Sequence, residues 1–290
     1  MSQKCHQSVT KFHQDRWSMN LARRWHGDYT TYTIHTEAPY YEATKNATCV
    51  LTPEGISGPY VYPPSQKLRQ DMTENQQGVP LWLDIGVIDM ETCRPLRDVL
   101  VDIWHCNSTG SYSSFTGISP NTPFPLLLEQ LNITNYTMGL TDLHTDEATW
   151  LRGLWPTNKN GIMEMKTVFP GFYANRTIHI HVQVHTKWNL RQNGTIVAGR
   201  TVSTGQIYFT EKVSAKVMST EPYASHTQIV RTTNAQDPFF PMDSVGGFNP
   251  IVNVVPIQHN DLSQGMVGYI TLGIDTRLIR NGSDPWDGSH

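Results

Sequence analysis

The strict alternation of polarity over residues 178–185 constrains the fold of this chain more than any other feature of its sequence. Every second position is apolar: Ile178, Ile180, Val182 and Val184. Because side chains of a β-strand point alternately to opposite faces, the pattern predicts a strand with one apolar face packed inward. The other face carries His179 and His181, about 6–7 Å apart at the backbone and therefore able to share one metal ion.

Two histidines at this spacing also occur on half-exposed strands that bind no metal, so neighbouring donors decide between the two interpretations. Pro170-Gly171 marks a turn that is expected to bring Tyr173 and Arg176 towards the histidine face. A second candidate tyrosine, Tyr112, lies upstream. Together these residues favour a metal centre with phenol and imidazole donors.

Composition favours one large all-β domain or two ordinary domains. The 290 residues include 21 glycines and 18 prolines, which supply many turns, and only 16% are charged against roughly 25% in typical soluble domains. The formal net charge is −3 and no basic run is present, which argues against nucleic-acid binding. No apolar run approaches the roughly 18 residues of a membrane-spanning helix, so we expect no membrane partner.

Short alternating segments predict the strands of a β-sandwich, mostly antiparallel and joined by long loops. The first two strands, residues 81–87 and 99–105, flank a turn at 93–96, and we expect them to form a hairpin-like pair. Further strands are expected at 165–169, 178–185, 206–210 and 267–274. His105 ends the second strand on its apolar face, so we expect a packed or hydrogen-bonded histidine there rather than a metal ligand.

A domain boundary is predicted near residue 49. Apolar positions three and four apart predict a short N-terminal helix over residues 6–25, within a helical and irregular arm at 1–48. Residues 49–290 form the β domain in this interpretation. It carries a surface insertion at about 116–150 and a mostly loop segment at 220–262.

Seven Asn-x-Ser/Thr sequons favour a secreted glycoprotein: Asn46, Asn107, Asn132, Asn135, Asn175, Asn193 and Asn281. We expect Asn175 to stay unmodified, because a glycan there would obstruct Tyr173 and Arg176. The chain begins Met1-Ser2-Gln3-Lys4 without an apolar signal region, which we interpret as a mature form behind an added methionine.

Four cysteines, an even number, agree with secretion and allow three disulfide connectivities. Cys93 and Cys106 lie near the open ends of the first strand pair. We therefore expect the pairing Cys93–Cys106 together with Cys5–Cys49.

A series of short motifs precedes and includes the histidine strand: Gly58-Pro59-Tyr60, Cys93-Arg94-Pro95-Leu96, Val101 to Asn107, Gly110-Ser111-Tyr112, Phe169 to Tyr173, and Arg176 to His181. In this order they resemble the intradiol ring-cleavage dioxygenases, the superfamily of catechol 1,2-dioxygenase and protocatechuate 3,4-dioxygenase. The leading segment Cys49 to Glu54 is similar to the secreted, single-domain branch of that family. The resemblance covers roughly residues 49–275.

The resemblance implies an Fe(III) ion with water or hydroxide as a fifth ligand and four protein ligands: Tyr112, Tyr173, His179 and His181. Arg176 and Gln206 match the family's pair beside the substrate ring, and Tyr173, once displaced, would act as the base for a substrate proton. A substrate pocket is implied at Ile56, Pro59 and Tyr60.

The sequence departs from the pattern of this family in two features. Where relatives often have Arg-Gly-x-Gln-x-Thr-Asp, this chain has a different sequence at Arg152 to Asn158. We expect the difference to alter a turn and a wall of the pocket. Dimeric members use an N-terminal helical domain, and the single helix predicted over 6–25 is too little for one, so we expect a monomer.

The implied activity is O₂-dependent cleavage of catechol or plant catecholic phenolics between the two hydroxyls, giving muconate-type products. Chemistry supports the implied metal, because two hard, anionic phenolates favour Fe(III) over Zn²⁺ or Fe²⁺. A cupin-like metalloenzyme would need a third histidine and a glutamate at strand spacing, and no convincing pair is present. The remaining alternative is a secreted β-sandwich that binds phenolics or glycans and has a vestigial metal site; the presence of all four donors argues against it.

Overall fold

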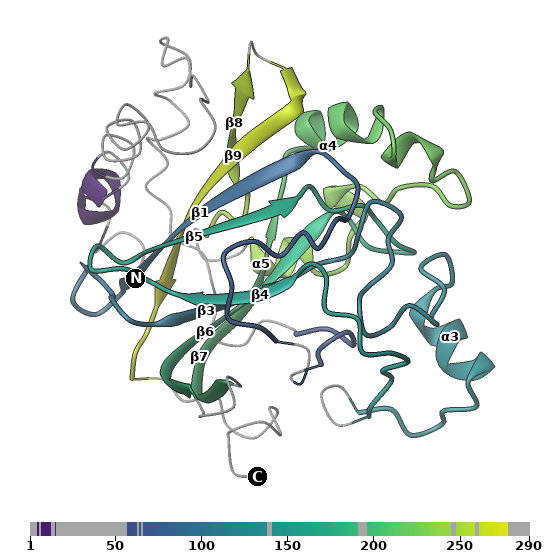
Figure 1. The fold of residues 1–290 in the computed structure, drawn as a ribbon, viewed down its shortest axis with the longest axis horizontal. Helices are drawn as coiled ribbons and strands as arrows, with labels where there is room; N and C mark the ends of the chain where they lie inside the picture. The colour runs from purple at the N-terminus through teal and green to yellow at the C-terminus, as the bar shows by residue number, and fades with distance from the viewer. Residues whose placement is uncertain are drawn as a thin grey trace.

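The structure, a computed structural model, describes residues 5, 7–12, 15, 57–62, 64, 66–137, 141–190, 196–244, 248–258 and 261–277. Within these ranges the chain is mostly β, with two sheets and a few short helices (Figure 1). Every strand pairing between the named strands is antiparallel except one. The expectation of a mostly antiparallel β protein is therefore confirmed.

One sheet has five strands and is organised around β1 (Pro80–Asp89). β1 pairs in parallel with β9 (Asp261–Ile274), and antiparallel with β5 (Ile162–Val168) and the short β2 (Arg94–Pro95). β8 (Asn253–Gln258) extends the sheet beyond β9. Alternate residues of β1 are buried in the main core, as their spacing predicts: Leu81, Leu83, Ile85 and Val87.

The second sheet has four strands in the order β4 (Arg152–Pro156), β3 (Leu100–Trp104), β6 (His179–Leu190) and β7 (Ile196–Tyr208). Its apolar residues Ile180, Val182 and Val184 on β6 belong to the same buried cluster as the apolar residues of β1. The apolar face of β6 thus packs inward, which confirms the interpretation of the alternation over residues 178–185. The histidine face is left to meet the loops at the end of the sheet.

Short helices occupy the connections between strands. α3 (Phe124–Gln130) lies in the insertion at 116–150, at the periphery of the molecule in Figure 1, and α4 (Glu211–Met218) follows β7. The segment predicted as mostly loop contains the strand β8 and three helical turns: η2 (Tyr223–Ser225), η3 (Asn234–Gln236) and α5 (Phe240–Asp243). None of the helices in the described ranges has the length and apolar character needed to cross a membrane.

β1 and β3 do not form the predicted hairpin-like pair, because they belong to different sheets. The turn at residues 90–93 closes only the two-residue strand β2, in which Arg94 pairs with Asp89 and Pro95 with Ile88. The chain then passes to the other sheet. Alternation of apolar and polar residues shows only that a strand has one face in a core. It does not show whether two successive strands are neighbours in one sheet or belong to different sheets.

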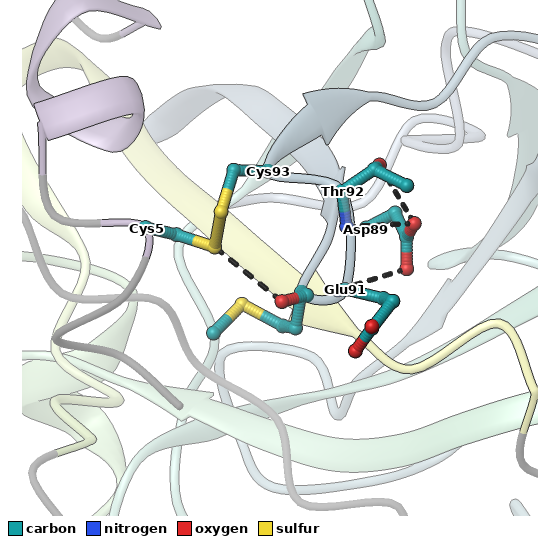
Figure 2. Close-up of a disulfide and its surroundings, with 6 residues drawn as sticks. Cys5, Asp89, Glu91, Thr92 and Cys93 are labelled. Carbon is teal, nitrogen blue, oxygen red and sulfur yellow. Dashed lines mark hydrogen bonds between the residues drawn. A yellow bond between two sulfur atoms is a disulfide. The ribbon is translucent and has the colours of Figure 1, made fainter.

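Both predicted disulfides, Cys93–Cys106 and Cys5–Cys49, are wrong: Cys5 is bonded to Cys93, and Cys106 is a buried free thiol. Figure 2 shows Cys93 in the turn after β1, where the carboxylate of Asp89 accepts hydrogen bonds from the turn. Cys93 precedes β3 and Cys106 follows it. A five-residue strand spans about 17 Å, more than a disulfide can bridge. Cys49 lies outside the described residues.

The disulfide joins Cys5, near the start of the chain, to the turn after β1. Residues 7–12 are helical, and Val9 and Phe12 pack in one buried cluster with Ile88 and Met90 at the end of β1. Apart from residue 15, the remainder of the helix predicted over residues 6–25 lies outside the described ranges.

Candidate functional site

The two histidines of β6 meet two tyrosines at one end of the four-stranded sheet. His179 and His181 are the first and third residues of β6, so their rings leave the same face of the strand. Their Nε2 atoms lie 3.1 Å apart, and the Tyr173 hydroxyl lies 3.3 Å from Nε2 of His179. The ring centres of Tyr112 and Tyr173 are 5.6 Å apart. All four predicted ligands are therefore neighbours, and all four are buried.

Local contacts orient both imidazoles. Nδ1 of His179 lies 2.6 Å from the carbonyl oxygen of Thr177, which can only accept, so Nδ1 carries the proton and Nε2 keeps its lone pair. The His181 ring stacks on Trp104, with ring centres 4.9 Å apart. Burial lowers the pKa of both histidines well below the usual value, and the positive charge of Arg176 acts in the same direction. Both rings are therefore neutral, the form that binds a metal.

The two tyrosine hydroxyls are buried in a way that suits a metal donor. The buried Tyr112 hydroxyl makes no hydrogen bond of normal geometry with the described residues, and the neighbouring Tyr173 hydroxyl interacts with it. Burial raises the pKa of Tyr112 well above its usual value and that of Tyr173 to about 12, although the charge of Arg176 acts to lower the pKa of both. A bound cation would supply the charge that lets such phenols ionise, and phenolate oxygens are hard donors suited to a trivalent ion.

Donor spacing also fits a single ion. Two ligands bound at about 2.1 Å and at a right angle lie about 3.0 Å apart, close to the 3.1 Å between the two Nε2 atoms. Within the described ranges, no group of three His, Cys, Asp or Glu side chains could hold a metal. A metal ion at His179 and His181 would therefore need donors of another type, and the buried hydroxyls of Tyr112 and Tyr173 are candidates.

Arg176 uses its whole guanidinium group at this site. Nη1 donates to the Tyr173 hydroxyl at 3.4 Å, Nη2 donates to Oε1 of Gln206, and Nε donates to the carboxylate of Asp237. Gln206 pairs with His181 in the register of β6 and β7, which places it beside the candidate ligands. Burial alone would lower the pKa of Arg176, but Tyr173 and Asp237 raise it above its usual value, so the group stays charged.

The segment 57–62 packs on the candidate ligands. The Tyr60 ring stacks on the Tyr112 ring, with 4.5 Å between their centres, and Tyr60 is 6% exposed. Of the three predicted pocket residues, Pro59 and Tyr60 belong to this segment. The third, Ile56, lies outside the described residues.

Gly58 lets the segment approach the ligands this closely. Its φ is +78°, and a Cβ at this position would lie 2.9 Å from Cε1 of His181. Any other residue would be strained in the backbone and would push against the imidazole, so glycine is needed for this contact.

His105 packs as predicted and is not a ligand in this arrangement. Nδ1 lies 2.7 Å from the carbonyl oxygen of Cys106, and Nε2 lies 2.7 Å from Oγ1 of Thr167. Burial lowers the pKa of His105 to about 4, so the ring is neutral. Both ring nitrogens are therefore occupied by structural hydrogen bonds.

The segment that departs from the family pattern, residues 152–158, supports the loop that carries Tyr112. Residues Arg152–Pro156 form β4, and the buried Arg152 donates to Oγ and to the carbonyl oxygen of Ser113, at 2.9 and 2.7 Å. Because Ser113 directly follows Tyr112, these bonds hold the tyrosine in place.

The sequence did not indicate two further buried residues of the site, Asp237 and Tyr208. Asp237 contacts Arg176, and Tyr208 contacts Gln206. Asp237 lies in the segment predicted as mostly loop, where no motif or periodicity marks it. The Tyr208 hydroxyl donates to Oδ2 of Asp243 at 2.5 Å and lies 3.1 Å from Oε1 of Gln206. The spacing of Gln206 and Tyr208, two residues apart on one strand, was a usable signal, because it places both side chains on one face.

Comparison with known proteins agrees with this geometry. The dioxygenase family model matches residues 56–211, more than half of the chain. An intradiol ring-cleavage dioxygenase from Tetranychus urticae has a similar structure, with a TM-score of 0.63 and 27% identity over 80% of this chain and 98% of that chain. A second dioxygenase crystal structure has a TM-score of 0.62 and 27% identity, with 80% and 98% of the two chains covered.

A more distant structure is the dioxygenase domain of a carbohydrate-binding fusion protein from Streptomyces sp. SirexAA-E. It has a TM-score of 0.41 and 23% identity over 78% of this chain and 98% of that chain. A search of curated protein sequences found no match. This chain belongs to the family of intradiol ring-cleavage dioxygenases.

Proposed function

We propose that this protein is a secreted, Fe(III)-dependent enzyme that uses O₂ to open catechol or catechol-bearing plant phenolics between the two hydroxyls. The observation that carries the proposal is the convergence of donors at one point. Nε2 of His179 lies 3.1 Å from Nε2 of His181 and 3.3 Å from the Tyr173 hydroxyl, and the buried Tyr112 belongs to the same cluster of rings. Membership of the dioxygenase family supports oxygenase chemistry on an aromatic ring.

The residues of the site have separate tasks in this proposal. Tyr112, Tyr173, His179 and His181 would hold Fe(III), which would supply Lewis-acid chemistry that activates the diol. Tyr173, as a phenolate, accepts the proton of a substrate hydroxyl. Arg176, 3.4 Å from the Tyr173 hydroxyl, stabilises negative charge that develops on the substrate. Gln206 holds one end of the guanidinium, and Tyr60 covers the Tyr112 ring.

Iron-loaded protein is expected to consume O₂ in the presence of catechol and to release a muconate that contains both oxygen atoms of the O₂ molecule. The reason is the donor set, because two phenolates without a carboxylate favour the ferric state, in which the ring rather than the metal reacts with O₂. An oxygen electrode measures the uptake, and mass spectrometry of the product formed under ¹⁸O₂ locates the oxygens. Zinc-loaded protein is the control, because Zn²⁺ has no redox chemistry and should support no uptake.

Two other outcomes would contradict the proposal in different ways. A yellow hydroxymuconic semialdehyde would show cleavage beside the hydroxyls rather than between them. Binding of catechol to iron-loaded protein without O₂ uptake would favour the alternative of a phenolic-binding protein with a vestigial metal site. A screen of catechol, caffeic acid and related diols under the same conditions would then rank the substrates.

We further propose that the protein is secreted and glycosylated. Its sequons support this, and so does the disulfide, since such bonds persist in oxidising compartments. Asn132 and Asn135 are exposed on the insertion, which suits modification. Asn175 is also exposed, but a glycan between Tyr173 and Arg176 would obstruct the site, so we expect it to stay unmodified.

Peptide mapping of unreduced protein from a secretory host is expected to recover Cys5 joined to Cys93 and to find glycans on the exposed insertion sequons. Asn107 is an internal control, because its side-chain nitrogen donates to Gln76 at 3.3 Å and its oxygen accepts from the backbone N–H of Ser111 at 3.0 Å. We expect it to carry no glycan. A Cys93–Cys106 peptide, or glycosylation confined to Asn107, would contradict these assignments.

Two structural proposals accompany this function. Apolar residues of both sheets belong to one buried core, which supports the sandwich arrangement expected from the sequence. The helical residues 7–12 pack on their own chain and are bonded to it through Cys5, which supports a monomer.

A further inference from the structure

We propose that Asp237 is a positioning residue, which aims the Arg176 guanidinium at Tyr173 and Gln206 from a segment that also fixes the ring of His179. The inference rests on the proposed function, since it takes Arg176 to act beside the substrate ring. It goes beyond that function by assigning the residue that sets the orientation of Arg176.

The ion pair between Asp237 and Arg176 is shielded from water. Nε of Arg176 lies 2.9 Å from Oδ2 of Asp237, and the two side chains are 10% and 0% exposed. Salt screens such a buried pair little, and water does not compete for its hydrogen bonds. The ring of Phe239 also covers the guanidinium, with its centre 4.4 Å from Cζ. Because Nε is held in this way, the two Nη atoms are left to face Tyr173 and Gln206.

Backbone groups fix the Asp237 carboxylate itself. Besides Arg176, Oδ2 accepts a hydrogen bond from the backbone N–H of Thr177 at 2.8 Å. Oδ1 accepts from the backbone N–H groups of Phe239 and Phe240 at 2.8 and 2.9 Å. Each carboxylate oxygen therefore has two donors, and a buried group with satisfied hydrogen bonds has no reason to reorient. Asp237 is a fixed point to which Arg176 is attached.

Thr177 connects the same support to a candidate metal ligand. Its hydroxyl donates to Oδ1 of Asn234 at 2.7 Å, and its carbonyl oxygen accepts from Nδ1 of His179 at 2.6 Å. Asn234 begins η3, three residues before Asp237. A shift of Thr177 would turn the His179 ring, so the contacts from residues 234–237 set the orientation of this ligand as well as that of Arg176.

A second ion pair in the same region offers a matched control. Arg231 pairs with Glu211 at 2.5 Å, and Glu211 also accepts a hydrogen bond from the backbone N–H of Asn234 at 2.7 Å. Both Glu211 and Asp237 hold the segment 231–237 by pairing with an arginine. Of the two arginines, only Arg176, the partner of Asp237, contacts the candidate site. If both carboxylates only supported the fold, their substitution would change kcat to a similar extent.

The test compares Asp237→Asn with Glu211→Gln in the full chain. In iron-free protein we expect the Arg176 Nε–H, followed by ¹⁵N NMR, to exchange at least about 10-fold faster in Asp237→Asn, because it loses a charge-assisted hydrogen bond. In iron-loaded protein, kcat for catechol should fall by about 10- to 100-fold, while KM and iron content change by less than about threefold. Glu211→Gln should keep the exchange rate and kcat of the parent.

A double variant separates positioning from general support of the fold. If Asp237 acts through Arg176, adding Asp237→Asn to Arg176→Gln should cause no further loss of kcat. Should Asp237→Asn fail to fold because it leaves a buried arginine unpaired, the double variant, which lacks both charges, should fold again.

Three results would overturn the inference: parent-like exchange and kcat in Asp237→Asn, an effect on kcat that adds fully to that of Arg176→Gln, or a double variant that also fails to fold. If the parent protein has no dioxygenase activity, the proposed function fails on its own. The exchange measurement in iron-free protein still decides whether Asp237 holds Arg176.

Discussion

Tyr173→Phe is expected to lower the turnover of catechol by about 10²- to 10⁴-fold while the protein folds normally. The substitution removes one oxygen at nearly constant volume, and that oxygen lies 3.3 Å from Nε2 of His179 and 3.4 Å from Nη1 of Arg176. The lost atom is both a candidate metal donor and the proposed proton acceptor. The ring keeps its edge contact with Tyr60, so the free energy of unfolding should change by less than about 1 kcal/mol.

Tyr136→Phe is the control for this substitution. Tyr136 lies in the insertion, packs edge-on against Phe124, and borders the buried cluster that contains the two candidate tyrosines without a ring contact to either of them. It should keep the turnover and the visible spectrum of the iron-loaded parent, whereas Tyr173→Phe and Tyr112→Phe should alter the tyrosinate-to-iron absorption. An unaltered spectrum in both of the latter variants would remove the tyrosines from the metal site.

Arg176→Lys is expected to lower kcat by about 10²- to 10³-fold while the protein still binds iron. Lysine keeps the charge, but a single ammonium on a flexible stem cannot bond to three partners held by a planar guanidinium. Those partners are Tyr173, Gln206 and Asp237. Steady-state kinetics with catechol and metal analysis of the purified variant measure the two effects separately.

Arg231→Lys is the control for this substitution, because it makes the same change outside the candidate site. Arg231 pairs with Glu211 and touches none of the candidate ligands among its hydrogen bonds. Because partly exposed ion pairs contribute little, we expect its kcat to stay within about twofold of the parent. If Arg176→Lys is equally active, the guanidinium has no direct part in turnover.

Local geometry explains why much of the site could be predicted from the sequence. His179 and His181 are two residues apart in a strand, so they share a face wherever that strand lies in the fold. The order of the short motifs identified the family and, with it, Tyr112, Tyr173 and Gln206. The pairing of Gln206 with His181 across β6 and β7 then brings the most distant of these residues to the site.

Long-range pairing explains what could not be predicted. The alternation in β1 and β3 was correctly assigned to strands, but each strand needs only a core to face, and the two belong to different sheets. Cys5 and Cys93 are 88 residues apart, and no spacing rule distinguishes that pair from the five other pairs that four cysteines allow. Asp237, 61 residues from Arg176, lies in a segment without any periodic pattern.

The sequence by itself determined several of the strands, the face of β6 that carries the candidate ligands, and the chemical nature of the candidate donors. It did not predict β4 or β8, and it predicted β7 only at its end. These properties depend on backbone geometry over a few residues and on the side chains themselves. Only the tertiary structure decided which sheet each strand joins, which cysteine meets Cys93, and which carboxylate holds Arg176. Such contacts join distant segments and are selected by the packing of the whole core, so they leave no local pattern in the chain.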